Sequence, residues 1–128
     1  RKILPIKEVQ LLLLSNSEDE ILLDKRPPVG VWPGLWSLPE LPLKNSVEDY
    51  CLERFGKSPL TVRTEKPFSH TFSHFKLMIH PVWVDVEESP KDLMEPNRSF
   101  WYNSIHSKKP AGLPAPVKKL LLKNFGKE

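Results

Sequence analysis

Residues 68–75 read Phe-Ser-His-Thr-Phe-Ser-His-Phe, so the triplet Phe-Ser-His occurs twice with a period of four. An aromatic ring can stack on a base or wedge between two, a hydroxyl can reach a base edge or a phosphate, and an imidazole can donate to an anion. Few structural roles call for these three side chains next to one another. The first functional hypothesis is therefore nucleic-acid recognition, and the elements around the repeat must position it.

Two other interpretations of the repeat stay open. In a helix, His70 and His74 would have His-x-x-x-His spacing, but no glutamate lies between them and the chain has one cysteine, so we expect no metal site. In a strand, the segment would be a buried aromatic strand without a binding role. One face would then hold Phe68, His70, Phe72 and His74, and the other Ser69, Thr71 and Ser73.

The composition describes an ordinary globular chain. Its 128 residues fit one domain with a real core, and the net charge of +3 is compatible with nucleic acid without arguing for it. Cys51 stands alone, which excludes an internal disulfide and favours a reducing compartment. The longest aliphatic run, 11–14, is too short to span a bilayer, so we expect no membrane association.

Hydrophobic periodicity predicts strands with a helix between them and another after them. The expected strands are 9–15, 20–25, 60–66, 75–86 and 99–103, with an extended piece at 35–38 and a hairpin joining the first two. The first helix spans 46–55, with Ser46 as N-cap and Gly56 at its end. The second spans 114–125, and its buried face holds Val117, Leu120, Leu121 and Phe125. This order predicts a mixed layer fold.

The block from Arg26 to Glu40 resembles the front half of a Nudix box, the motif of enzymes that cleave nucleoside diphosphates linked to another group. Gly34 and Glu40 match its first two fixed positions. The match then fails, because Glu48-Asp49 replaces Arg-Glu, Leu52-Glu53 replaces Glu-Glu, and Gly56 falls one residue late.

That failure has a chemical meaning. Nudix chemistry needs several carboxylates on one helix face to hold magnesium against a diphosphate. Asp49 and Glu53 are spaced to share a face, but Leu52 stands where the pattern has a ligand. We therefore expect at most a weakened magnesium site and no efficient hydrolysis.

Taken together, these motifs resemble the C-terminal domain of MutY-type adenine DNA glycosylases, over nearly the whole chain. The resemblance rests on five pieces in order, each weak alone. They are Leu4-Pro5 before a Leu-rich strand, the block 26–39 with Trp-x-Gly-Leu-Trp, the 68–75 repeat, Trp101-Tyr-Asn103, and Gly112-Leu-Pro-Ala-Pro-Val-Lys118.

The resemblance implies an α+β fold, an α/β/α sandwich of Nudix type with a mixed sheet between two main helices. Residues 1–8 would be an interdomain linker remnant and 9–128 a lesion-recognition domain without catalytic residues. The parent enzyme would excise adenine mispaired with 8-oxoguanine, using an N-terminal domain with a 4Fe-4S cluster that this chain lacks. We expect a monomer in the bacterial cytosol, with lesion-containing duplex DNA and the catalytic domain as partners.

The resemblance also assigns a site: Phe72, Ser73 and His74 would bind DNA around the lesion. His70 and Thr71 are further candidates for DNA binding, and Lys118, Lys119 and Arg26 are candidate phosphate contacts. Simpler roles remain open for several of these residues: Phe72 as a core aromatic, His70 as a structural histidine and the lysines as a solvated face. Trp32 and Trp36 are expected to serve packing rather than base stacking.

The physics of lesion reading can be stated without the family. Oxidation of guanine at C8 puts a proton on N7, so an edge that accepted a hydrogen bond now donates one. A serine hydroxyl donates and accepts, and so discriminates poorly, whereas a backbone carbonyl only accepts. Two alternatives stay open: an active Nudix hydrolase of oxidised nucleoside triphosphates such as 8-oxo-dGTP, and a protein-interaction module.

Overall fold

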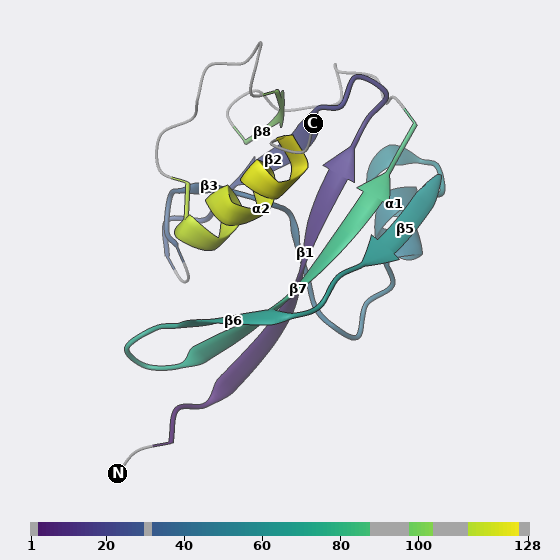
Figure 1. The fold of residues 1–128 in the computed structure, drawn as a ribbon. Helices are drawn as coiled ribbons and strands as arrows, with labels where there is room; N and C mark the ends of the chain where they lie inside the picture. The colour runs from purple at the N-terminus through teal and green to yellow at the C-terminus, as the bar shows by residue number, and fades with distance from the viewer. Residues whose placement is uncertain (1–2, 30–31, 88–97, 104–112, 126–128) are drawn as a thin grey trace.

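The computed structural model describes residues 3–29, 32–87, 98–103 and 113–125, and its ribbon is shown in Figure 1. The strands are β1 (Ile6–Ser15), β2 (Ile21–Lys25), β3 (Trp36–Ser37), β4 (Glu40–Leu41), β5 (Thr61–Thr64), β6 (Phe68–Thr71), β7 (Lys76–Asp85) and β8 (Ser99–Tyr102). The helices are α1 (Val47–Phe55) and α2 (Ala115–Phe125). Within these residues no helix is long and apolar enough to cross a membrane.

A mixed sheet organises the fold. Its strands follow the order β3-β2-β1-β7-β5, while β4, β6 and β8 pair with β1, β7 and β2. β1 and β7 lie parallel from the pair Ile6↔Lys76 to the pair Ser15↔Asp85, and the other pairings are antiparallel. The predicted hairpin between the first two strands is confirmed, with Ser15 opposite Ile21.

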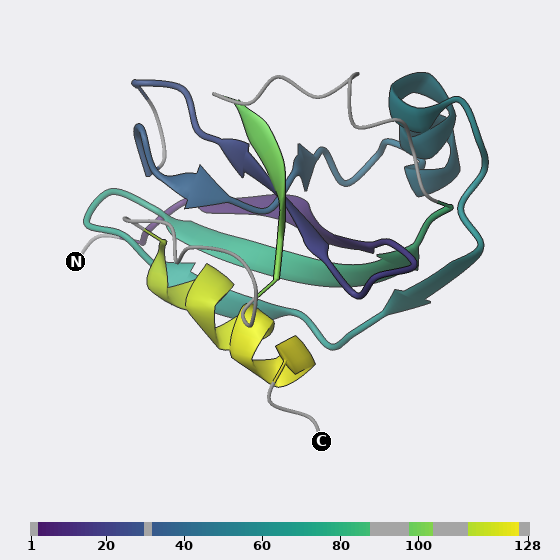
Figure 2. The ribbon, with the colours of Figure 1, turned by 90° about the horizontal axis from the view of Figure 1, so that it is seen from above.

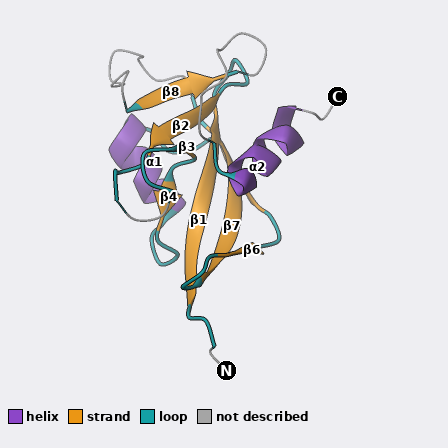
Figure 3. Ribbon diagram, turned by 90° about the vertical axis from the view of Figure 1, so that its left-hand side faces the viewer, coloured by secondary structure: helices purple, strands orange, loops and turns teal. Residues whose placement is uncertain are grey.

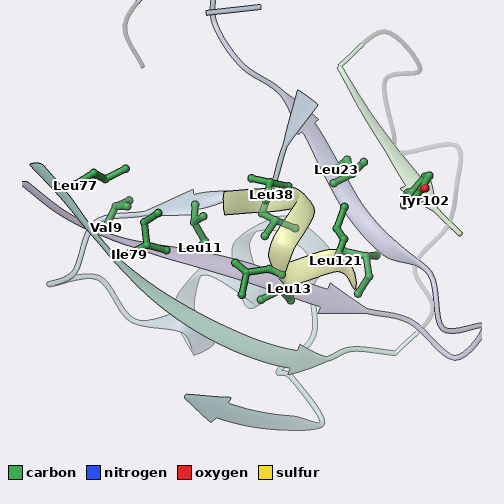
Figure 4. Close-up of a cluster of buried hydrophobic side chains, with 12 residues drawn as sticks. Val9, Leu11, Leu13, Leu23, Leu38, Leu77, Ile79, Tyr102 and Leu121 are labelled. Carbon is green, nitrogen blue, oxygen red and sulfur yellow. The ribbon is translucent and has the colours of Figure 1, made fainter. Parts of the chain in front are cut away.

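The two helices cover opposite faces of this sheet, as Figure 3 shows. Because side chains alternate along a strand, β1 feeds both apolar layers. Leu11 and Leu13 pack in the layer under α2, and Leu12 and Leu14 in the layer under α1. Figure 4 shows the first layer, with Leu121 of α2 among side chains from the sheet. The α/β/α sandwich expected from the sequence is confirmed.

Helix α1 is bounded as predicted. The Ser46 Oγ accepts a hydrogen bond from the Asp49 N–H at 3.2 Å, which satisfies a donor of the first turn. Gly56 ends the helix with φ 76°, a left-handed conformation that residues with a Cβ rarely adopt. Val47 and Cys51 are buried on its inner face, and Leu52 is exposed.

Helix α2 also follows its sequence pattern. Val117, Leu120 and Leu121 are buried, whereas Lys118 and Lys119 are exposed. The side chains of Lys123 and Phe125, which the sequence assigned to opposite faces, lie outside the described residues.

Strand boundaries differ from the predictions at two informative places. β1 begins at Ile6, so residues 6–8, which were expected in a linker, are part of the sheet. Their side chains are all exposed, so these residues lack the alternation of buried and exposed side chains that predicts a strand. They belong to the strand because their backbone pairs with β7. At the other place the expected strand 75–86 is shorter, because Phe72 to Phe75 form a turn.

That turn joins β6 and β7 into a hairpin. Figures 1 and 2 show the hairpin projecting beside the N-terminal half of β1, at the end of the molecule opposite α1. The 68–75 repeat is therefore split: its first triplet lies in β6, and its second triplet forms the tip.

Candidate nucleic-acid interface

The tip of the hairpin, which we call the 72–75 turn, presents the second Phe-Ser-His triplet to solvent. The Phe72 N–H donates to the Phe75 carbonyl at 2.8 Å, which closes the turn. Ser73 and His74 between them are exposed, and Phe72 and Phe75 are half-buried. Within the described part of the chain, no donor pairs with the carbonyls of Ser73 and His74. The turn thus offers a hydroxyl, an imidazole and two unpaired carbonyls at one exposed site.

An aromatic cluster made of Trp32, His70, Phe72 and Phe75 supports this turn. The Phe72 and Phe75 rings stack with centroids 4.6 Å apart and planes 18° apart. His70 meets the Phe72 ring edge-on at 4.8 Å, and Trp32 contacts both His70 and Phe72 at 6.0 and 5.8 Å. Such ring pairs favour defined geometries, so the cluster restrains the Phe72 ring at the base of the turn. Phe72 and His70 therefore have a packing role, and Phe72 keeps an accessible part as well.

The loop after β2 places Trp32 in this cluster. Trp32 has φ 49° and Gly34 has φ 72°, and a left-handed conformation is uncommon for a bulky residue such as tryptophan. Backbone hydrogen bonds hold the loop: the Gly34 N–H donates to Pro27 at 2.9 Å, and the Leu35 N–H to Trp32 at 3.3 Å. Gly34, a matched position of the Nudix box, thus lies in the loop that holds Trp32 beside the hairpin.

The predicted residues of β6 are divided between two faces. The strand register sets His70 opposite the buried Leu77, and Thr71 opposite Lys76, so His70 and Thr71 point to opposite sides of the hairpin. Thr71 is exposed but lies away from the aromatic cluster.

The three predicted phosphate contacts differ in their surroundings. Lys118 and Lys119 are exposed on α2, and the Lys119 ammonium lies 5.6 Å from the centre of the Phe68 ring. Arg26, in contrast, forms an ion pair with Glu40 at 2.8 Å, and its side chain is only 15% exposed. Arg26 therefore links the two ends of the segment between β2 and β4 through its ion pair with Glu40. Of the three predicted phosphate contacts, Lys118 and Lys119 are the exposed ones.

The acidic residues of the degenerate Nudix box are divided: Asp49 and Glu53 line one hollow, whereas Glu40 pairs with Arg26. Glu40 is held by Arg26, and Leu52 is 48% exposed on the outer face of α1, where the pattern has a ligand. Asp49 and Glu53 line an open hollow of ≈ 320 Å³ together with Lys44. Among the described residues, no three acidic, histidine or cysteine side chains group closely enough to hold a metal ion. The donor set does not fit the hard-oxygen octahedron that magnesium requires.

Sequence reasoning missed a polar network on the inner side of α1. Arg54 donates to both carboxylate oxygens of Asp24 at 2.8 and 2.9 Å, and also to Tyr50 at 2.7 Å and Ser99 at 3.0 Å. Burial alone would lower the pKa of Arg54, but the hydrogen bond and charge of Asp24 raise it. Burial raises the pKa of Tyr50. These residues come from α1, β2 and β8, which are far apart in the sequence. The one signal in the sequence was that polar residues stand in otherwise apolar segments.

The comparisons with known proteins agree with this geometry. The C-terminal domain of mouse MUTYH, solved in complex with human PCNA, superposes with a TM-score of 0.72 at 15% identity, over 93% of this chain and 86% of that one. A mutT/nudix family protein from Listeria innocua superposes with a TM-score of 0.71 at 13% identity, over 97% and 94%. These matches show that the fold is Nudix-like.

The chain belongs to the NUDIX domain family: the family model matches residues 10–123. An adenine DNA glycosylase of Buchnera aphidicola subsp. Acyrthosiphon pisum (strain APS) is 30% identical over 128 residues, 99% of this chain and 35% of that protein. The chain spans about a third of the length of the curated relatives it matches.

Proposed function

We propose that this chain is the lesion-recognition domain of an adenine DNA glycosylase, acting on adenine mispaired with 8-oxoguanine. The single observation that carries the proposal is the 72–75 turn, in which an exposed hydroxyl, an imidazole and two carbonyls without a donor among the described residues are mounted on a ring stack. The curated relatives, which are adenine DNA glycosylases, support the same assignment.

In this proposal the turn enters the duplex beside 8-oxoguanine. Phe72 presents its accessible part as a wedge, which lowers the cost of unstacking before the opposing adenine is flipped. A carbonyl of Ser73 or His74 accepts from the N7–H of the lesion, and the same carbonyl would face an acceptor on normal guanine. One such contact supplies about 1–3 kcal/mol of discrimination.

The glycosidic chemistry belongs, in this proposal, to another part of a longer protein. A 4Fe-4S cluster would also lie there, because this chain has one cysteine and Cys51 is buried between α1 and the sheet. This chain contributes binding and no catalytic residue, and the parent acts on DNA in the bacterial cytosol.

Fluorescence anisotropy on duplexes that differ only in one 8-oxoguanine tests the proposal. We expect weak, salt-sensitive binding with tighter binding of the lesion duplex. Identical isotherms for the two duplexes, unchanged by Phe72→Ala, would contradict it.

A Nudix hydrolase of 8-oxo-dGTP is the competing enzyme function, since the Nudix fold itself is compatible with it. The engaged Glu40 and the exposed Leu52 argue against it, because among the described residues no third acidic, histidine or cysteine side chain joins Asp49 and Glu53 in a metal-binding group. Pyrophosphate release from 8-oxo-dGTP that requires magnesium and disappears in Glu53→Gln would establish the hydrolase instead.

A further inference from the structure

Two lysines, Lys7 and Lys119, lie over aromatic rings of the hairpin. The Lys7 ammonium is 4.7 Å from the centre of the Phe75 ring, and the Lys119 ammonium is 5.6 Å from that of Phe68. Neither lysine forms an ion pair within the described residues. A cation–π contact restrains an ammonium group but does not neutralise it, so both charges stay available to an external anion.

The strand register places Lys7 and the ring beneath Lys119 on the same face of the sheet, at opposite edges of β7. Lys7 lies in β1 opposite Leu77 of β7, and Phe68, beneath Lys119, lies in β6 opposite Ile79 of the same strand. β7 thus separates the two positions, and because neighbouring strands are about 4.8 Å apart, β1 and β6 are about 10 Å apart.

Two acidic residues near these lysines in the chain, Glu8 and Glu65, pair with other side chains. Glu8, the chain neighbour of Lys7, points to the other face of β1, where it is bonded to His80 at 2.8 Å. Glu65, on the segment before β6, pairs with Arg63 at 3.6 Å. The first turn of α2 has no acidic residue. Among the described residues, the charges of Lys7 and Lys119 are therefore not neutralised by an ion pair and are complementary to a polyanion.

We propose that Lys7 and Lys119 are a pair of phosphate-binding residues that seat the hairpin on the DNA backbone, Lys7 beside β7 and Lys119 over β6. The inference rests on the proposed function, since it takes duplex DNA as the ligand. It adds Lys7, in a segment that the sequence assigned to a linker, and it gives the pair a positioning role. Phosphate contacts of this kind fix register and orientation and carry no base preference.

Anisotropy titrations of the 128-residue chain at several salt concentrations test the pair, using duplexes with and without one 8-oxoguanine. Each phosphate contact contributes about 0.9 to the slope of log K against log salt. We expect Lys7→Gln and Lys119→Gln each to lower that slope by about 0.9 and to weaken both duplexes by the same factor. Lys7→Arg and Lys119→Arg keep the charge and should retain the slope, which separates charge from packing.

Lys57→Gln is the matched control, because Lys57 is exposed but paired with Glu87 at 3.0 Å, and it should leave the slope unchanged. A wild-type slope in both Gln variants, or weakening confined to the lesion duplex, overturns the pair while leaving lesion recognition intact. Reduced slopes in a chain that binds both duplexes equally support the pair and count against lesion recognition. Thermal melting of every variant checks whether the fold is retained.

Discussion

Phe72 and Phe75 stack on each other across the turn that they enclose, with ring centroids 4.6 Å apart. The stack restrains the two ends of the turn from which Ser73 and His74 project, and such a restraint reduces the ordering entropy lost on binding. A half-buried Phe72 reconciles the two roles that the sequence left open, because one part of the ring packs and the other remains accessible.

Truncating Phe72 should weaken recognition of the lesion without altering phosphate contacts. Stacking of an aromatic side chain on a base is worth about 1–3 kcal/mol. We expect Phe72→Ala to lose about 5- to 150-fold in affinity for the 8-oxoguanine duplex, by the conversion of 1.4 kcal/mol per tenfold, while the salt slope is kept. Phe72→Tyr preserves the ring and serves as the control. A reduced salt slope in Phe72→Ala would count against the assignment of stacking to Phe72 and of phosphate contacts to other residues.

Removing the hydroxyl of Ser73 should have a smaller effect than removing the Phe72 ring. Since the hydroxyl donates and accepts, it contributes affinity to both guanine and 8-oxoguanine, whereas the free backbone carbonyls distinguish them. We expect Ser73→Ala to retain most of the ratio of the two dissociation constants, measured by anisotropy on paired duplexes. Loss of the whole ratio in Ser73→Ala would move lesion discrimination to the side chain.

Trp32 should control lesion recognition from beneath the turn. Its ring contacts His70 and Phe72, so Trp32→Ala removes the support of both at once. We expect Trp32→Ala, like Phe72→Ala, to lower the affinity for the 8-oxoguanine duplex and to leave the slope of log K against log salt unchanged. Trp32→Phe should restore part of this affinity. If Trp32→Ala binds both duplexes as the wild type does, the cluster is not needed to hold the turn.

The network around Arg54 should stabilise the fold. Hydrogen bonds to charged groups contribute about 1.5–3 kcal/mol, and the Arg54 and Asp24 side chains are 26% and 28% exposed. We expect Arg54→Met and Asp24→Asn each to lower the unfolding free energy by about 1–3 kcal/mol in urea titrations. The double variant should lose less unfolding free energy than the two single variants together, because each single change leaves the other polar group without its partner. Strict additivity of the two losses would show that the pair does not act as a unit.

Local sequence patterns predicted most helices and strands, whereas contacts between residues far apart in the sequence were not predicted. Ser46 and Gly56 bound α1 because capping depends on neighbours three or four residues away. The contact of Trp32 with Phe72 joins segments 40 positions apart, and no periodicity encodes it. Residues 6–8 were misassigned because their strand character comes from β7, far along the chain.

Cys51 should be unreactive while the chain is folded. The residue is fully buried, and burial, with the charge of Glu48 adding to it, raises the pKa of its thiol from 9.0 to about 11. The thiolate is the reactive form, so at pH 7.5 we expect very slow alkylation by iodoacetamide, which becomes fast once urea unfolds the chain.

The same shift predicts how stability depends on pH. The folded chain holds the Cys51 proton more tightly than the unfolded chain, so this contribution is fully present below about pH 9 and is lost as the pH rises through about 11. Unfolding free energies measured in urea from pH 7 to 11 should fall more steeply in the wild type than in Cys51→Ala, which lacks the titrating group. Parallel curves for the two proteins, together with rapid alkylation at pH 7.5, would place the thiol in contact with water.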